Sequence, residues 1–287
     1  MAVDLSRRKF LKTTTIGSAA LALPAIALSQ PGTPAKIGLQ LWTLRKEIET
    51  DFSGTLQYIA DIGFGGVETA FFPDHVTIRQ AAKALDQAGL KVFSVHCEIP
   101  IGKQKDNMLE MAEAYQCTRM VWHGWPEDSR YKTKDGIKQL AEIYNQANAF
   151  AQSNGLQFGL HNHWWELEVK EDGTYPYQTL IDLIDENIFF EIDTYWAKVA
   201  GQDPAVIVGN LGKRAPLLHI KDGPGIQDKP MVAVGKGVQD FPGIVAAANG
   251  TTEWMIVELD ECKTDMLQAV RDSYSYLTRN GLAQGNI

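Results

Sequence analysis

The 287-residue sequence predicts an α/β fold, specifically a closed (β/α)8 (TIM) barrel, and two observations carry this prediction. From Lys36 onward, short apolar segments alternate with segments of helical periodicity, and unbroken βα alternation indicates a parallel sheet. The alternation repeats eight times over roughly 250 residues, the usual size of a closed barrel. An open doubly wound sheet is the alternative, but the segment after the first strand, "QLWTLRKE" (40–47), lacks the glycines of a phosphate-binding turn.

Eight apolar segments are the expected strands, and each is bounded by turn residues or by a polar end. In chain order they span residues 36–42, 65–70, 91–97, 119–125, 156–163, 188–196, 215–222 and 254–260. Amphipathic segments between and after them are the expected helices: 52–64, 78–90, 106–117, 136–155, 177–185 and 266–281. Gly63 and Gly89 fall near the ends of the first two, where glycine commonly closes a helix. No linker divides residues 36–287, so we expect a single domain.

The first thirty residues differ in character from the rest. "SRRKFLK" (6–12) precedes an apolar run (15–30) with "ALS" at 27–29, an arrangement typical of a secretory signal, and the paired arginines favour the twin-arginine route. A membrane anchor is the alternative, but Ser18 and Pro24 interrupt a run that is already short for a span. We therefore expect a signal peptide at 1–30, export to the periplasm, and no stable membrane anchor after cleavage.

Composition excludes some classes of partner. The net charge of −8 argues against a nucleic-acid partner, because phosphate binding requires clustered lysine and arginine. The three cysteines include no CxxC pair and cannot build a disulfide framework. The oligomeric state stays open, a homo-oligomer included.

Polar and aromatic residues gather at the ends of the expected strands, where barrel enzymes place their active sites. Five of the six histidines fall there, and His75 is the exception. The strand-end set comprises Gln40, Trp42, Glu68, His96, Glu98, His123, Trp125, His161, His163, Glu166, Asp193, His219, Lys221 and Glu258. A ring of such residues predicts a site inside the barrel mouth.

Asp193, His219 and Glu258 end the last three expected strands, 26 and 39 residues apart. Two carboxylates and an imidazole from adjacent strands favour a divalent ion such as Mn²⁺, Mg²⁺, Co²⁺ or Zn²⁺. The fourth ligand is expected from "HNHWWE" (161–166), because His161 and His163 would share one face of a strand.

Seven segments together resemble the xylose isomerase-like barrel superfamily, the sugar phosphate isomerase/epimerases, from Lys36 to near the end of the chain. They are "GLQLWTLR", "SVHCEIP", "LHNHWWE", "EIDTYW", "LLHIKDG", "VGKGVQDF" and "IVELDE". In the ketose epimerase branch, glutamate, aspartate, histidine and glutamate from strands five to eight hold a divalent metal. The resemblance implies that Asp193, His219 and Glu258 match the last three.

The strand-five glutamate of that branch has no clear counterpart in this sequence. His161, His163 and Glu166 are the available replacements, and His163 is the one we expect. The departure bears on mechanism, because the two glutamates serve as the acid/base pair in the family.

The resemblance implies proton abstraction next to a carbonyl through a metal-stabilised enediolate, catalysed by an isomerase or epimerase. Export favours an unphosphorylated sugar or keto-sugar, since only "VGKG" (234–237) offers a glycine-rich phosphate cradle. A lyase or dehydratase acting on a 3-keto-glycoside or keto-inositol is the alternative, and a non-catalytic periplasmic sugar-binding barrel is the second. The candidate catalytic residues are Glu258, Glu166, Lys221 and His96. The candidate substrate-binding residues are Gln40, Trp42, Glu68, His123, Trp125, His161, Trp165 and Trp196.

Overall fold

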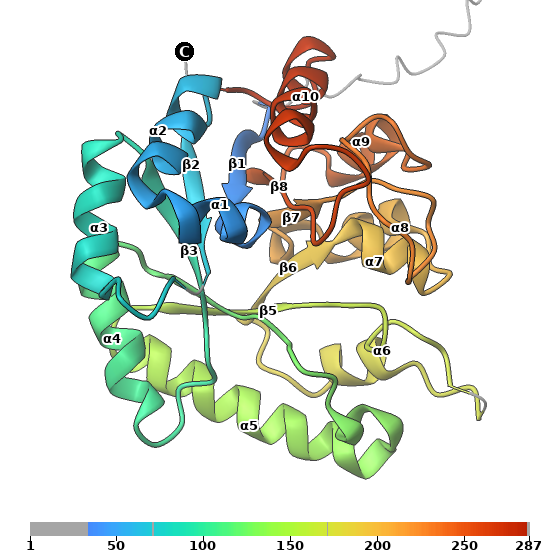
Figure 1. Ribbon diagram of the computed structural model, residues 1–287. Helices are drawn as coiled ribbons and strands as arrows, with labels where there is room; N and C mark the ends of the chain where they lie inside the picture. The colour runs from blue at the N-terminus through green and yellow to red at the C-terminus, as the bar shows by residue number, and fades with distance from the viewer. Residues whose placement is uncertain (1–33, 71, 171, 286–287) are drawn as a thin grey trace, which may run out of the picture. The chain divides into compact units, whose positions relative to one another are not determined.

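The computed structural model describes residues 34–285, apart from residues 71 and 171, and these residues form the predicted closed barrel (Figure 1). Eight parallel strands pair in chain order, and β8 pairs with β1 to close the sheet. Helices surround the strands, so the predicted (β/α)8 fold is confirmed. The expected signal peptide at 1–30 lies outside the described residues.

The strands are short, and the helices between them vary in length. The strands are β1 (Lys36–Gln40), β2 (Gly66–Thr69), β3 (Lys91–Cys97), β4 (Arg119–Trp122), β5 (Gln157–His161), β6 (Phe189–Asp193), β7 (Leu217–Ile220) and β8 (Trp254–Val257). The helices are α1 (Arg45–Thr50), α2 (Phe52–Ile62), α3 (Ile78–Gln87), α4 (Gln104–Tyr115), α5 (Lys134–Ser153), α6 (Pro176–Ile181), α7 (Thr194–Val199), α8 (Pro204–Leu211), α9 (Phe241–Ala248) and α10 (Met266–Arg279). None of the helices in the described part of the chain is long and apolar enough to cross a membrane.

Six of the eight strands end two or three residues before the predicted end. At some strand ends a polar side chain accepts hydrogen bonds from the backbone amides that follow it, and the strand pairing ends there. Asp193 is the clearest case: its Oδ1 accepts hydrogen bonds from the amides of Tyr195 and Trp196 and caps α7, so "TYW" (194–196) is helical rather than extended. The predicted strand boundary at 196 is therefore wrong.

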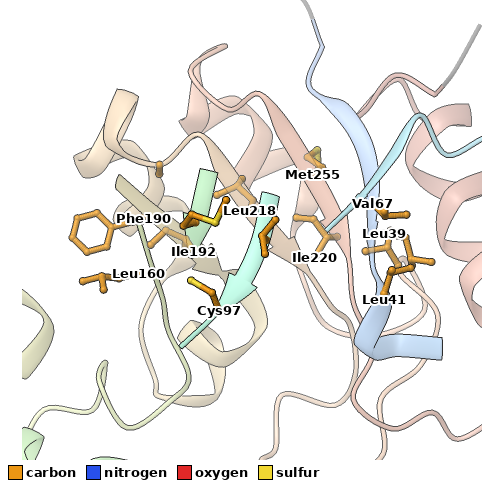
Figure 2. Close-up of a cluster of buried hydrophobic side chains, with 14 of the residues drawn as sticks. Leu39, Leu41, Val67, Cys97, Leu160, Phe190, Ile192, Leu218, Ile220 and Met255 are labelled. Carbon is orange, nitrogen blue, oxygen red and sulfur yellow. The ribbon is translucent and has the colours of Figure 1, made fainter. Parts of the chain in front are cut away.

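Two apolar layers hold the barrel together. Outward-facing strand residues pack against the helices, as the labelled residues of Figure 2 illustrate, among them Leu39, Leu160 and Leu218. A second, smaller cluster comprises Phe93, Val121, Phe189, Leu217, Trp254 and Ile256. Alternation along the strands places this second cluster inside the barrel, where it fills the end opposite the polar strand ends.

A register shift between β2 and β3 adjusts which side chains of β3 point inward. Val67 pairs with Val92 while the next residue, Glu68, pairs with Ser94, so β3 carries one extra residue at this point. Such a bulge breaks strict alternation. As a result, Phe93 can join the interior apolar cluster while His96 still faces the interior polar site.

Candidate metal centre

The inner face of the barrel carries buried charged side chains next to the interior apolar cluster of Phe93, Val121, Phe189, Leu217, Trp254 and Ile256. Glu68, Glu191, Asp193 and His219 are completely buried, and Glu258 is only 5% exposed. Buried charge at this density is costly unless the groups pair with each other or with a metal. The contacts among these side chains therefore decide what the site can bind.

His161, Asp193, His219 and Glu258 come from the ends of β5 to β8, and each offers one ligand atom within 4.8 Å of the others. Three atoms of this group, Asp193 Oδ2, His219 Nδ1 and Glu258 Oε2, are buried and lie close together. His219 Nδ1 lies 2.6 Å from Glu258 Oε2. Two carboxylates and two imidazoles are ligands that divalent transition metals accept, so this donor set fits a metal.

Lys221, the residue that follows the end of β7, places a positive charge next to the same carboxylates. Its Nζ lies 3.0 Å from Asp193 Oδ2, 2.9 Å from Glu258 Oε2 and 2.8 Å from Asp260 Oδ2. Burial by itself lowers the pKa of Lys221, but these carboxylates outweigh burial and raise the pKa well above its usual value. Lys221 is therefore an ammonium group that can donate hydrogen bonds.

The two carboxylate oxygens of Asp193 divide their roles. Oδ1 caps α7, as described above, while Oδ2 faces Lys221 and the rest of the ligand group. The backbone of Asp193 is also fixed, because its amide donates to Asn162 Oδ1 over 3.0 Å. The side chain is thus held in place before any metal binds.

A second layer of polar side chains lies against the ligand group. Glu191 Oε1 lies 2.6 Å from His96 Nε2, 3.0 Å from His219 Nε2 and 3.1 Å from His161 Nδ1. Glu68 Oε1 accepts hydrogen bonds from Gln40 Nε2 and His219 Nε2, both over 2.7 Å. Burial, followed by the charge of Glu191, raises the pKa of Glu68 to about 7.

The pKa directions differ among the four residues of the ligand group. Burial lowers the pKa of His161 well below its usual value, which leaves the neutral imidazole that metals bind. Burial also lowers the pKa of His219, but the charges of Glu191, Glu258 and Glu68 raise it well above the usual value. Burial favours a neutral Glu258, yet Lys221 and His219 outweigh burial and hold its pKa well below the usual range. Burial raises the pKa of Asp193 to about 6.

The structure favours His161 over His163 as the strand-five member of the site. β5 ends at His161, and Asn162 bonds to the backbone of Asp193, so residue 163 no longer follows the strand alternation on which the prediction rested. The His163 ring instead stacks on Trp165 at 4.3 Å, and its amide donates to Glu166 Oε2. Among the described residues, His163 belongs to neither group of candidate metal ligands.

Glu166, an expected catalytic residue, is buried, and its Oε2 accepts a hydrogen bond from the His163 amide in the turn after β5. Burial raises the pKa of Glu166 to about 8. Among the described residues, Glu166 belongs to neither group of candidate metal ligands, and its expected catalytic role stays a prediction. His96, another expected catalytic residue, directs its Nε2 inward to Glu191 and Glu68, a position that favours support of the site over proton transfer to a substrate.

The expected substrate-binding aromatic residues divide into buried and exposed groups. Trp165 and Trp196 are 2% and 7% exposed, and Lys221 Nζ lies 5.4 Å from the Trp196 ring centroid. Trp125 and Trp42 are 57% and 38% exposed, after β4 and β1 respectively. The buried pair packs around the polar residues, whereas the exposed pair faces solvent, with the Arg45 guanidinium 4.5 Å from the Trp42 ring centroid.

His123 lies at the same end of the barrel as the exposed tryptophans. Its Nδ1 accepts a hydrogen bond from the Trp125 amide, and its Nε2 lies 3.4 Å from Glu98 Oε1. Burial and the neighbouring His96 lower the pKa of His123 to about 4, so it is neutral at ordinary pH.

Sequence reasoning missed two carboxylates of the site, Glu191 and Asp260. Glu191 precedes Asp193 by two residues on β6, and this spacing places both on the inner face of the barrel. A glutamate inside the apolar segment "FFEID" (189–193) was therefore a readable signal. Asp260 follows the end of β8, and no spacing pattern in the sequence connects it with Lys221.

The turn "VGKG" (234–237), the glycine-rich candidate for a phosphate-binding turn, instead binds the carboxylate of Asp222. The amides of Gly235 and Gly237 both donate to Asp222 Oδ2 over 2.9 Å, and Gly223 and Gln239 donate to Asp222 Oδ1. The backbone donors that a phosphate would need are thus occupied by the carboxylate of Asp222.

Comparison with known proteins places this geometry in a family. The sequence profile of the xylose isomerase-like TIM barrel family matches residues 56–279. The chain belongs to the xylose isomerase-like TIM barrel family. No curated protein sequence matches the chain.

Solved structures agree with this assignment. A sugar phosphate isomerase/epimerase from Parabacteroides distasonis is 26% identical to this chain, with a TM-score of 0.72. The match covers 91% of this chain and 100% of that one. This chain shares 18% identity and a TM-score of 0.64 with an L-ribulose 3-epimerase, over 86% of this chain and 94% of the other. A 3-keto-D-glucoside 4-epimerase from E. coli matches at 18% identity and a TM-score of 0.61, over 85% and 99% of the two chains. The last two show similarity of fold alone.

Proposed function

We propose that the protein is a divalent-metal-dependent isomerase or epimerase that acts on an unphosphorylated sugar or keto-sugar. One observation carries the proposal: His161, Asp193, His219 and Glu258 are buried at the ends of four neighbouring strands, and each offers one ligand atom within 4.8 Å of the others. The similarity to the sugar phosphate isomerase/epimerase supports isomerisation or epimerisation over elimination and over binding without turnover.

His161, Asp193, His219 and Glu258 would hold the metal. A bound divalent ion supplies a Lewis acid that polarises a substrate carbonyl and lowers the cost of removing the neighbouring proton. We assign the strand-five position to His161, because His161 reaches the other three ligand atoms and His163 does not.

Glu258 and Lys221 are the two groups we propose to handle protons and charge. Glu258 is ionised and can accept a proton, while the Lys221 ammonium, 2.9 Å away, can donate a hydrogen bond to the substrate oxygen where negative charge develops. This arrangement replaces the two-glutamate acid/base pair of the epimerase branch, since the strand-five residue here is a histidine.

We propose a substrate without a phosphate group because the amides of "VGKG", which could otherwise bind phosphate, donate their hydrogen bonds to Asp222. Exposed Trp125 and Trp42 offer aromatic faces to the C–H face of a sugar ring. Export through the twin-arginine route, which would place the enzyme where phosphosugars are scarce, remains a prediction from the sequence.

The test is hydrogen–deuterium exchange at carbon. A panel of keto-sugars is incubated with the protein in D2O, and NMR follows loss of the signal of the proton next to the carbonyl. We expect exchange that EDTA abolishes and Mn²⁺ restores, and that falls about 10²–10⁴-fold in Glu258→Gln, the usual contribution of a general base. Glu261→Gln, an exposed neighbour of the site, is the matched control. Sugar binding with no exchange would instead identify a binding protein, and exchange that survives EDTA would overturn the role of the metal.

A further inference from the structure

Glu191 occupies an unusual position in the barrel, because one of its oxygens contacts three histidine rings. It is completely buried on β6, and its Oε1 lies 2.6 Å from His96 Nε2, 3.0 Å from His219 Nε2 and 3.1 Å from His161 Nδ1. Two of these rings belong to the proposed metal ligands. The His161 and His219 rings pack with their centroids 4.6 Å apart, so a group that holds one ring also constrains the other.

These contacts determine which nitrogen of each ring is free to bind a metal. A ring nitrogen that donates a hydrogen bond to a carboxylate carries a proton, and in a neutral ring the opposite nitrogen has the free lone pair. For His219, Nε2 faces Glu191 Oε1 and Glu68 Oε1, so Nδ1, which lies 2.6 Å from Glu258 Oε2, is the nitrogen on the side of the proposed metal. For His161 the protonated nitrogen is Nδ1, which leaves Nε2.

Glu68 is the other carboxylate in this layer, but its contacts are different. Glu68 Oε1 reaches His219 and His96, and Gln40 holds it from the far side. Glu191, by contrast, contacts both proposed histidine ligands. Glu191 is therefore the residue through which the orientation of the two rings is coupled.

We infer that Glu191 is the positioning residue of the metal centre: it fixes the tautomers of His161 and His219 so that one binds through Nε2 and the other through Nδ1. This inference rests on the proposed metal site. Carboxylates that orient ligating histidines in this way typically change metal affinity by about 10–100-fold when they are mutated.

The alternative is that Glu191 itself binds a second ion with His96, His161 and His219, whose ligand atoms also lie within 4.8 Å of one another. The number of ions bound per chain separates the two: one ion in wild type supports positioning by Glu191, and two ions in wild type with one in the Glu191 variants support a second site.

The first test is Co²⁺ binding to full-length wild type, Glu191→Gln and Glu191→Met, followed by visible absorption, with Glu186→Gln as a surface control on the approach to β6. We expect one Co²⁺ per chain in all four proteins. We expect affinity to fall about 10-fold in Glu191→Gln, which keeps an accepting oxygen, and toward 100-fold in Glu191→Met, which does not. A folded Glu191→Met that binds Co²⁺ within threefold of wild type would overturn the inference, as would two Co²⁺ in wild type and one in the variants.

The second test needs no substitution, so it decides the matter even where a variant fails to fold. Wild-type protein labelled with ¹⁵N-histidine is studied by NMR with and without Zn²⁺. We expect two coordinated rings, one through Nδ1 and one through Nε2; coordination of both through the same nitrogen would overturn the inference. Failure of wild type to bind either metal would refute the proposed metal centre itself, while the tautomers of the metal-free rings would still report whether Glu191 orients them.

Discussion

Lys221 provides the sharpest prediction about stability, because it neutralises the same carboxylates that the metal would bind. It is 1% exposed, and Asp193 and Glu258, its two most deeply buried partners, lie within 3.0 Å of its ammonium. Lys221→Met keeps most of the side-chain volume but leaves two buried carboxylates facing each other. Removal of one partner from a buried ion pair typically costs about 3–5 kcal/mol.

The free energy of unfolding of Lys221→Met in EDTA should therefore lie about 3–5 kcal/mol below that of wild type, a fall in Tm of roughly 6–20 °C for a chain of this size. A divalent ion supplies the missing positive charge, so the variant should also bind Mn²⁺ more tightly than wild type does. Mn²⁺ at 100 times Kd adds about 2.7 kcal/mol, and at a fixed Mn²⁺ concentration the tighter-binding variant gains more than wild type.

Urea unfolding of wild type, Lys221→Met and Lys213→Met, an exposed lysine, would be measured in EDTA and in Mn²⁺. The exposed control should stay within about 0.5 kcal/mol of wild type in both buffers. A Lys221→Met protein as stable as wild type in EDTA, or one that gains no more than wild type from Mn²⁺, would refute the reasoning that lysine and metal share these carboxylates.

Three further predictions follow from single side chains. Asp193→Asn should keep the cap on α7 yet lose Mn²⁺ affinity, whereas Asp193→Ala should lose both and unfold about 1 kcal/mol more easily than Asp193→Asn; equal stability of the two in EDTA would show that the cap contributes nothing. Because burial raises the pKa of Glu166 to about 8, the folded state binds its proton more tightly than the unfolded state, so this group makes stability fall as pH rises from about 4.5 to 8 by at most about 1.4 kcal/mol per pH unit. Glu166→Gln should flatten that profile in urea titrations at several pH values, while exposed Glu168→Gln should leave it unchanged. Trp125→Ala should raise KM with little change in kcat, since a stacking contact at the rim binds substrate and transition state alike; an unchanged KM would remove Trp125 from the sugar site.

The fold could be predicted from the sequence because strand and helix alternation is a local signal that repeats eight times. The ends of the strands could not, because they depend on contacts between strands. β5 ends where Asn162 bonds to the backbone of Asp193, and those residues are 31 positions apart in the chain. The alternation rule applied to "HNH" (161–163) thus predicted both histidines on one strand face and could not show that only His161 remains on the strand.

The candidate site shows the same division between local and long-range information. Asp193, His219 and Glu258 were readable because each ends a strand, and the structure brings all three together with His161. The spacing of Glu191 and Asp193 could place Glu191 on the inner face of the barrel, but its partners, the rings of three other strands, could not be predicted. Its contacts cross 95, 30 and 28 residues of sequence, and no local pattern encodes them.

Metal content of the purified protein tests the central claim most directly. Wild type, His161→Ala and His163→Ala would be loaded with Mn²⁺, dialysed and measured by elemental analysis, with circular dichroism to confirm that each is folded. The account predicts about one ion per chain in wild type and His163→Ala, and a loss of most of it in His161→Ala. Wild type without metal, or a folded His161→Ala that keeps its metal while His163→Ala loses it, would contradict the account.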